Sequence, residues 1–194
     1  MKRVSIIAAA TALAMLTSPA AAQLAEDGPR FVQAVRDRDG NKATELLRTR
    51  PVVLNARDDR GDTALLVALS RQDDTWTAYL LQQGADPNLP ARNGDTPLIA
   101  AARVGYAQGV EWLLGLSVRV DQGNRMGETP LIVAVQQRHA DIVRLLLEAG
   151  ADPDKTDSAA GYSARDYANR DTRSREILRM IEAKRASGRS TQGR

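Results

Sequence analysis

Few residues in this chain are of the types that perform catalysis, and they do not stand in catalytic patterns. His139 is the only histidine, and the chain contains no cysteine. A zinc site built from the usual His and Cys ligands therefore cannot form. The nearest acid, Asp141, does not stand at the spacing of an orienting acid in a Ser-His-Asp set, and the phosphate-binding pattern G-x-x-x-x-G-K-[ST] is absent. We expect no enzymatic activity, no metal and no cofactor.

Three carboxylates cluster at Asp58, Asp59 and Asp62. Oxygen ligands of this kind can bind calcium, but their spacing does not match an EF-hand loop. We interpret them as solvated acids at the tip of a hairpin, with calcium binding as the alternative.

These residues lie within a sequence that repeats every 33 residues. Gly-Asp-Thr-Ala-Leu at 61–65 returns as Gly-Asp-Thr-Pro-Leu at 94–98 and as Gly-Glu-Thr-Pro-Leu at 127–131, and a weaker copy, Gly-Tyr-Ser-Ala, follows at 161–164. A second motif, Leu-Leu-Gln-Gln-Gly-Ala-Asp-Pro-Asn from 80, returns as Leu-Leu-Glu-Ala-Gly-Ala-Asp-Pro-Asp from 146. A fixed period of this length predicts stacked units of one supersecondary type.

In period and motifs the chain resembles the ankyrin repeat family. The resemblance implies an all-α solenoid of about five helix-turn-helix units with β-hairpin-like connections. The family's histidine in each repeat is replaced by Leu66, Ile99 and Ile132, which suit burial. The terminal repeats match less well, as expected of caps. The repeat domain is predicted over 23–186, with repeats at about 28–60, 61–93, 94–126, 127–160 and 161–186.

Local chemistry agrees with this arrangement. Thr63, Thr96 and Thr129 can each cap a helix through the side-chain oxygen. The best second helix has an apolar stripe over 142–147, with the i, i+3, i+4 spacing of one buried face. In the degraded first repeat we expect helices over 31–37 and 42–49.

Two packing expectations concern the middle of the array. Ser117 stands where other repeats have glycine after the second helix, so we predict either a strained left-handed serine or a reshaped loop. Trp76 and Trp112 align with buried positions, which favours core packing over partner contact. Trp76 is further expected to fill the space left by Gly109 in the next repeat.

The resemblance also implies where a partner binds. The family binds proteins with its hairpin tips and the exposed face of the first helices, which together form a concave groove. Arg60, Arg92 and Arg125 are expected to form a ladder of guanidinium groups there, alternating with carboxylates. Met126 is a plausible apolar anchor among these charges. The candidate partner-binding residues are Asp59, Arg60, Asp62, Arg92, Asn93, Asp95, Arg103, Arg125, Met126, Glu128 and Gln136.

The first residues of the chain have the pattern of a secretory signal. Lys2 and Arg3 precede an apolar run over 4–16 that is short for a membrane span. Small residues then lead to a peptidase site between Ala22 and Gln23. We predict a cleaved signal peptide over 1–22, export to a bacterial periplasm, and no stable membrane anchor. A short buried N-terminal helix is the alternative.

Charge is unevenly distributed along the chain. The net charge is +3, but Lys2, Arg3 and the basic residues after position 183 exceed that excess, so the repeat body is slightly acidic. This argues against nucleic acid as a partner. We interpret 187–194 as a disordered basic tail, and weak attraction to anionic lipid is the alternative.

Together these observations predict a non-enzymatic protein-interaction module. We expect a monomer that binds another protein of the same compartment as an adaptor or accessory protein. The alternative is an immunity or inhibitor protein that blocks an exported toxic enzyme. The mixed signs expected along the groove favour the adaptor.

Overall fold

The computed structural model of the protein describes the backbone of residues 19–191 and the side chains of residues 26–184. The described chain consists of helices, short turns and long loops, with isolated β-bridges in place of a sheet. The elements are α1 Pro19–Arg36, α2 Gly40–Thr49, the 3-10 helix η1 Pro51–Asn55, α3 Ala64–Ser70, α4 Asp74–Gln82, α5 Pro97–Val104, α6 Ala107–Leu114, α7 Pro130–Gln137, α8 Ala140–Glu148, α9 Ala164–Arg170, the 3-10 helix η2 Thr172–Ser174 and α10 Arg175–Thr191.

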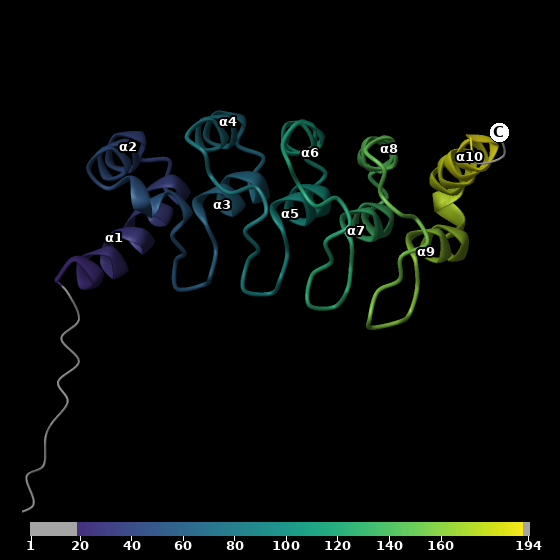
Figure 1. Cartoon of the computed structure of the whole chain (residues 1–194), viewed down its shortest axis with the longest axis horizontal. Helices are drawn as coiled ribbons and strands as arrows, with labels where there is room; N and C mark the ends of the chain where they lie inside the picture. The colour runs from purple at the N-terminus through teal and green to yellow at the C-terminus, as the bar shows by residue number, and fades with distance from the viewer. Residues whose placement is uncertain (1–18, 192–194) are drawn as a thin grey trace, which may run out of the picture.

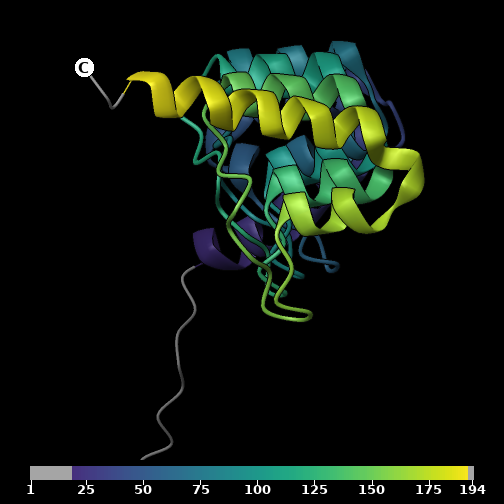
Figure 2. The ribbon, with the colours of Figure 1, turned by 90° about the vertical axis from the view of Figure 1, so that its right-hand side faces the viewer.

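These helices stack as five antiparallel pairs. Helices α1, α3, α5, α7 and α9 form an inner layer, and α2, α4, α6, α8 and α10 form an outer layer (Figure 1). The loops that join successive pairs all project from the inner layer to the same side, as the end-on view also shows (Figure 2). The predicted all-α solenoid is therefore confirmed, with its hairpin-like loops along one edge.

Threonine caps begin the inner helices α3, α5 and α7, as predicted. The hydroxyls of Thr63, Thr96 and Thr129 each accept a hydrogen bond at 3.2 Å from the backbone N–H three residues later. At α9, Ser163 and Asp166 form a complete capping box. Each cap satisfies a helix donor that would otherwise be buried without a partner.

The core lies between the two layers and between neighbouring pairs. Nearly every residue of α3, α5 and α7 is buried, because each of these helices is covered by its own partner and by both neighbours. Alanines at the equivalent positions Ala68, Ala101, Ala134 and Ala168 are almost fully buried and let the helices approach closely. Along the described residues, no helix is long and apolar enough to cross a membrane.

The turn from inner to outer helix contains a left-handed residue in four repeats. These residues are Arg38, Gln72, Gly105 and Arg138, and three of them are not glycine. A left-handed conformation costs such residues roughly 1 kcal/mol. Each of the three long side chains reaches the next repeat, which offsets this cost. The contacts are Arg38 Nε to Asp73 Oδ2 at 3.1 Å, Gln72 Nε2 to the Val104 carbonyl at 2.7 Å and Arg138 Nη1 to Asp171 Oδ2 at 3.2 Å.

Helix α1 is much longer than the sequence predicts. It begins at Pro19 rather than near Phe31, and it continues through Gly28 and Pro29. Gly28 lies so close to the next segment that a Cβ there would stand 2.7 Å from Ala56 Cβ. Asp27 is buried and pairs with Arg50 at 2.8 Å. This close approach and this ion pair fix the helix N-terminal to the predicted start.

The opposite end also differs from the prediction. Helix α10 runs to Thr191, so residues 187–191 are helical rather than part of a disordered tail. The helix is anchored on the last pair by Ile177 and Ile181, which are buried. Residues 192–194 and most of the predicted signal, 1–18, lie outside the described residues.

The loop at Ser117 is reshaped, which is one of the two predicted outcomes. Gly84 and Gly150 adopt φ values of 87° and 90°, as expected after α4 and α8. After α6, the cap is Gly115 in a right-handed conformation, and Ser117 is not left-handed. Replacing Ser117 by glycine would therefore relieve no strain.

Trp76 is buried, as predicted, but it does not fill the space at Gly109. It packs edge-on against Tyr79, with ring centroids 5.5 Å apart. Gly109 is instead covered by Tyr106, because a Cβ at 109 would stand 2.3 Å from the Tyr106 ring. Burial, together with a hydrogen bond from the Tyr106 hydroxyl to Asp74, raises the pKa of Tyr106. Trp112 is half-buried and packs against the same core.

Candidate partner-binding surface

Each hairpin is closed by the same backbone hydrogen bond. An N–H donates to a carbonyl across the loop in Asp58 to Asp62, Ala91 to Asp95 and Asn124 to Glu128, at 2.8–3.0 Å. In the last hairpin Asp157 donates to Tyr162 instead, one residue further along. This larger loop contains the extra residue that is implied by the spacing of 34 residues between Gly127 and Gly161.

Asp or Asn usually stands at the base of the hairpin and holds the tip. One side-chain oxygen of Asp58, Asn124 or Asp157 accepts two or three backbone N–H groups of its own loop. This local bonding explains why the long loops are ordered. The second hairpin has Ala91 at this position, and Asn93 accepts from Asp95 N instead. The base of that hairpin therefore has a methyl group in place of a carboxylate or an amide.

Neighbouring hairpins pack through their tip glycines. Gly61 and Gly94 have φ values of 83° and 88°, and each lies against the next hairpin. A Cβ at Gly61 would stand 2.8 Å from Arg92 Cβ, and one at Gly94 would stand 3.0 Å from Arg125 Cγ. The stems of Arg92 and Arg125 are therefore seated at equivalent places along the array.

A hollow of about 470 Å³ opens between the first and second hairpins, and Arg125 of the third hairpin also lines it. Its floor is formed by inner-helix residues, including the apolar Leu66 and Ala100, and Ala91, where the other hairpins have Asp or Asn, also lines it. Six of the predicted residues line it, and they are Arg60, Asp62, Arg92, Asn93, Asp95 and Arg125. The structure thus brings the centre of the predicted groove together at one place.

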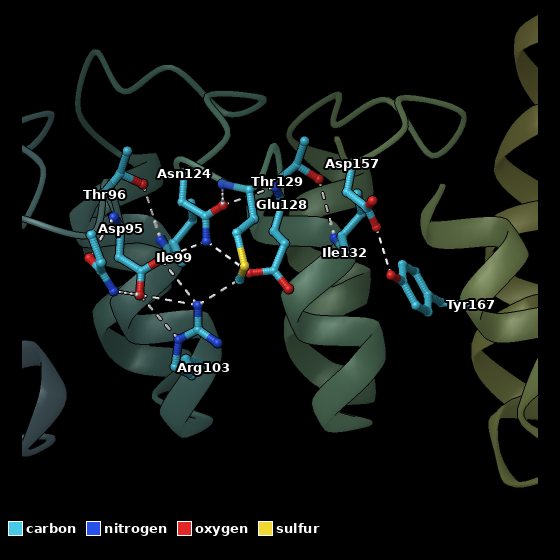
Figure 3. Close-up of polar contacts among 12 residues, drawn as sticks. Asp95, Thr96, Ile99, Arg103, Asn124, Glu128, Thr129, Ile132, Asp157 and Tyr167 are labelled. Carbon is cyan, nitrogen blue, oxygen red and sulfur yellow. Dashed lines mark hydrogen bonds and ion pairs between the residues drawn. The ribbon is translucent and has the colours of Figure 1, made fainter. Parts of the chain in front are cut away.

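The predicted alternation of arginines with carboxylates is wrong at two of its three acids. Asp95 and Glu128 are buried, and they face Arg103 on α5 rather than the tip arginines (Figure 3). Arg103 Nη2 lies 3.1 Å from Asp95 Oδ1 and 3.7 Å from Glu128 Oε2. Asn124 Nδ2 donates to both carboxylates at 2.8 Å. Because the acids point inward, they hold adjacent repeats together, and Arg103 is primarily part of this network.

The other predicted residues are spread along the hairpin edge. Asp59 is exposed, and its carbonyl accepts from Arg92 Nη2 at 2.8 Å. Met126 is 52% exposed at a tip, as expected of an anchor. Gln136 lies on α7, where it lines a second hollow with Arg138, Tyr167, Arg170 and Arg173. The predicted cleavage position, Ala22 and Gln23, lies within α1.

Sequence reasoning missed two contacts that fix hairpins to inner helices. Arg36 Nη2 at the end of α1 pairs with Asp58 Oδ2 at 2.5 Å and approaches Asp62 Oδ2 at 3.7 Å. Tyr167 Oη donates to Asp157 Oδ2 at 2.6 Å. Burial opposes ionisation of Asp157, but this bond and the backbone N–H groups of the loop outweigh it and lower its pKa. The repeat of Asp or Asn at 58, 124 and 157 was the available signal for these contacts.

His139 begins α8 at the inner-to-outer turn, away from the hollow, and its ring lies over Gly105, with Cε1 2.7 Å from where a Cβ would stand. The ring therefore packs against the neighbouring repeat. Among the described side chains, no group of His, Asp and Glu is arranged to hold a metal ion.

The hairpin edge and the stacked pairs agree with a comparison against known families. A family model described as ankyrin repeats (3 copies) matches residues 31–124 and again residues 77–157, which together cover more than half of the chain. Such repeats are generally modules for protein–protein interaction rather than enzymes. The chain belongs to the ankyrin repeat family.

Proposed function

We propose that this protein is an exported, monomeric adaptor that binds a protein partner through the hairpin edge and the inner-helix hollow. The observation that carries the proposal is the hollow itself, because six of the residues predicted for recognition line its walls. Ordered loops present these side chains at little further entropic cost. Export is inferred from the signal-like residues 1–22 and from the absence of cysteine.

An inhibitor or immunity protein is the second candidate. The alternation of signs that favoured an adaptor is weakened at the hairpin tips, because Asp95 and Glu128 are turned inward to Arg103, although Asp62 and Asp95 still line the hollow. A surface of one sign accelerates association with an oppositely charged partner, which an inhibitor of a toxic enzyme requires. The neighbouring genes discriminate an adaptor from an immunity protein, since an immunity protein is encoded beside its toxin.

Photo-crosslinking tests the proposed surface without depending on charge. The photoreactive residue p-benzoyl-phenylalanine is placed at Met126 on a hairpin tip, or at Leu116 beyond the outer helix α6. Both side chains are apolar and similarly exposed, at 52% and 43%. We expect a partner from periplasmic extract to crosslink at Met126 and not at Leu116. Crosslinking at Leu116 alone would show that the partner binds the outer-helix side and that the proposed surface is wrong.

Export has a separate test. The mature protein should begin at Gln23 and be recovered in the periplasmic fraction, since the pattern before it is that of a cleaved signal. N-terminal sequencing after cell fractionation measures this. Recovery of the intact Met1 end in the cytoplasm would contradict export and leave the binding surface unaffected.

A further inference from the structure

Three arginines at the hollow have no acidic partner. Arg60, Arg92 and Arg125 line its walls. Among the described side chains, no carboxylate lies within ion-pair distance of any of them, although the ion pairs of the neighbouring acids are present. The one bond of an arginine head group here joins Arg92 to the Asp59 carbonyl. Three positive charges are therefore concentrated at one place on a slightly acidic repeat body.

The two acids of the hollow do not neutralise these arginines. Asp62 is approached by Arg36 at 3.7 Å, and Asp95 is held by Arg103 at 3.1 Å. Each cation is contributed by an inner helix and is shared with a second acid, because Arg36 also pairs with Asp58 and Arg103 also approaches Glu128. Each of these two clusters therefore keeps one excess negative charge, and the three tip arginines outnumber these two charges, so the hollow remains net positive.

The arginines are also held in position. Arg92 and Arg125 pack their stems over Gly61 and Gly94, so part of their ordering cost is met on folding. Ala91 lines the same hollow, at a position where the other hairpins have the longer Asp or Asn.

We propose that this hollow binds an acidic segment of the partner protein, with aspartate or glutamate side chains paired to Arg60, Arg92 and Arg125. Planar guanidinium groups suit carboxylates because they donate two parallel hydrogen bonds. The proposal rests on the proposed function, because it names the chemistry of the partner at the same surface. Alanine at position 91, in place of Asp or Asn, sets this hairpin apart from the other three.

A labelled acidic peptide tests the proposal directly. The probe is a short fluorescein-labelled polyglutamate peptide with an amidated C-terminus, and the control probe is the polyglutamine peptide of equal length. We expect anisotropy to show salt-sensitive binding of the first peptide and not of the second. Arg92→Gln with Arg125→Gln should weaken that binding about tenfold or more, because two charge-assisted pairs with the peptide are lost.

Two further variants separate the site from the overall charge. Arg48→Gln with Arg179→Gln removes the same charge from the outer helices α2 and α10, and it should change affinity less than about twofold. Ala91→Asp restores the residue type found at Asp58 and Asp157. It should close the hollow, place an acid beside the arginines and abolish peptide binding, while the hairpin stays folded because its N–H groups gain an acceptor.

The outcomes distinguish this proposal from the proposed function. If Met126 crosslinks a partner but the peptide does not bind, the acidic segment is wrong and the interaction surface remains. The same conclusion follows if Arg92→Gln with Arg125→Gln weakens peptide binding no more than the outer-helix control does. Binding of phosphatidylglycerol vesicles without binding of the peptide would overturn the proposal in favour of a lipid surface. Peptide binding that Ala91→Asp leaves intact would place the acidic segment elsewhere.

Discussion

Removal of the Arg103 charge should destabilise the array by an amount that the geometry sets. Arg103→Met keeps the length of the side chain but leaves Asp95 and Glu128, both buried, without a cation. Removing one partner of a fully buried ion pair costs about 3–5 kcal/mol. Here the Arg103 side chain is 37% exposed, so water replaces part of the lost interaction, and Asn124 still donates to both acids. We expect a loss of about 2–3 kcal/mol.

The assay is urea denaturation followed by circular dichroism, with midpoint and slope both compared. Arg144→Met is the matched control, because Arg144 on α8 forms an exposed pair with Glu148 at 3.4 Å. That variant should change the free energy of unfolding by less than about 0.5 kcal/mol. The difference between the two variants isolates burial from the loss of a positive charge.

A second substitution tests the cause of the loss. Glu128→Gln alone removes one charge from the network and should cost about 1 kcal/mol or less. In the Arg103→Met background the same change removes one of two adjacent negative charges, so it should restore stability. The reasoning is refuted if Arg103→Met is no more costly than Arg144→Met. It is equally refuted if Glu128→Gln destabilises the Arg103→Met variant further.

The remaining predictions concern the turns, the core and acid. Gln72→Ala keeps the left-handed strain and loses the bond to the next repeat, so Gln72→Gly should be more stable than it by about 1 kcal/mol, measured by urea denaturation. Trp76→Ala should cost about 3–5 kcal/mol because the ring is buried, and partner binding by the folded fraction should not change. The pKa of Asp157 is lowered on folding, so its contribution to stability is present above its unfolded pKa and is lost as pH falls through the folded value. The destabilisation caused by Asp157→Ala at neutral pH should therefore shrink below about pH 4, in denaturation curves recorded across that range.

The sequence predicted those parts of the fold that depend on short-range chemistry. Thr96 and Thr129 were recognisable as caps because the bond they make spans only three residues. The fixed period likewise predicted the succession of helix pairs. It also predicted that the hairpins lie at the same side. Gly84 was recognisable as a left-handed helix end, since few residues other than glycine adopt that conformation.

The repeat pattern of the sequence does not predict the contacts between repeats. The repeat pattern aligns Trp76 with Gly109, but the residue that covers this glycine is Tyr106. Its hydroxyl donates a hydrogen bond to Asp74 of the neighbouring helix pair. The start of α1 depends on the close approach of Gly28 to Ala56 and on the pair between Asp27 and Arg50. Each of these contacts requires knowledge of which side chains meet between units, and periodicity does not contain it.

The same limitation affected the reading of charge, and it bears on function. Along the sequence the tip arginines alternate with Asp62, Asp95 and Glu128, which suggested a striped surface. In the fold, Arg36 and Arg103 approach from the inner helices and take these acids as partners, because a buried carboxylate is costly without a nearby cation. The arginines at the tips are left as the free charges. A surface on which the signs alternate in sequence thus presents unpaired arginines in structure, and the partner's chemistry must be inferred from the charges that folding leaves without partners.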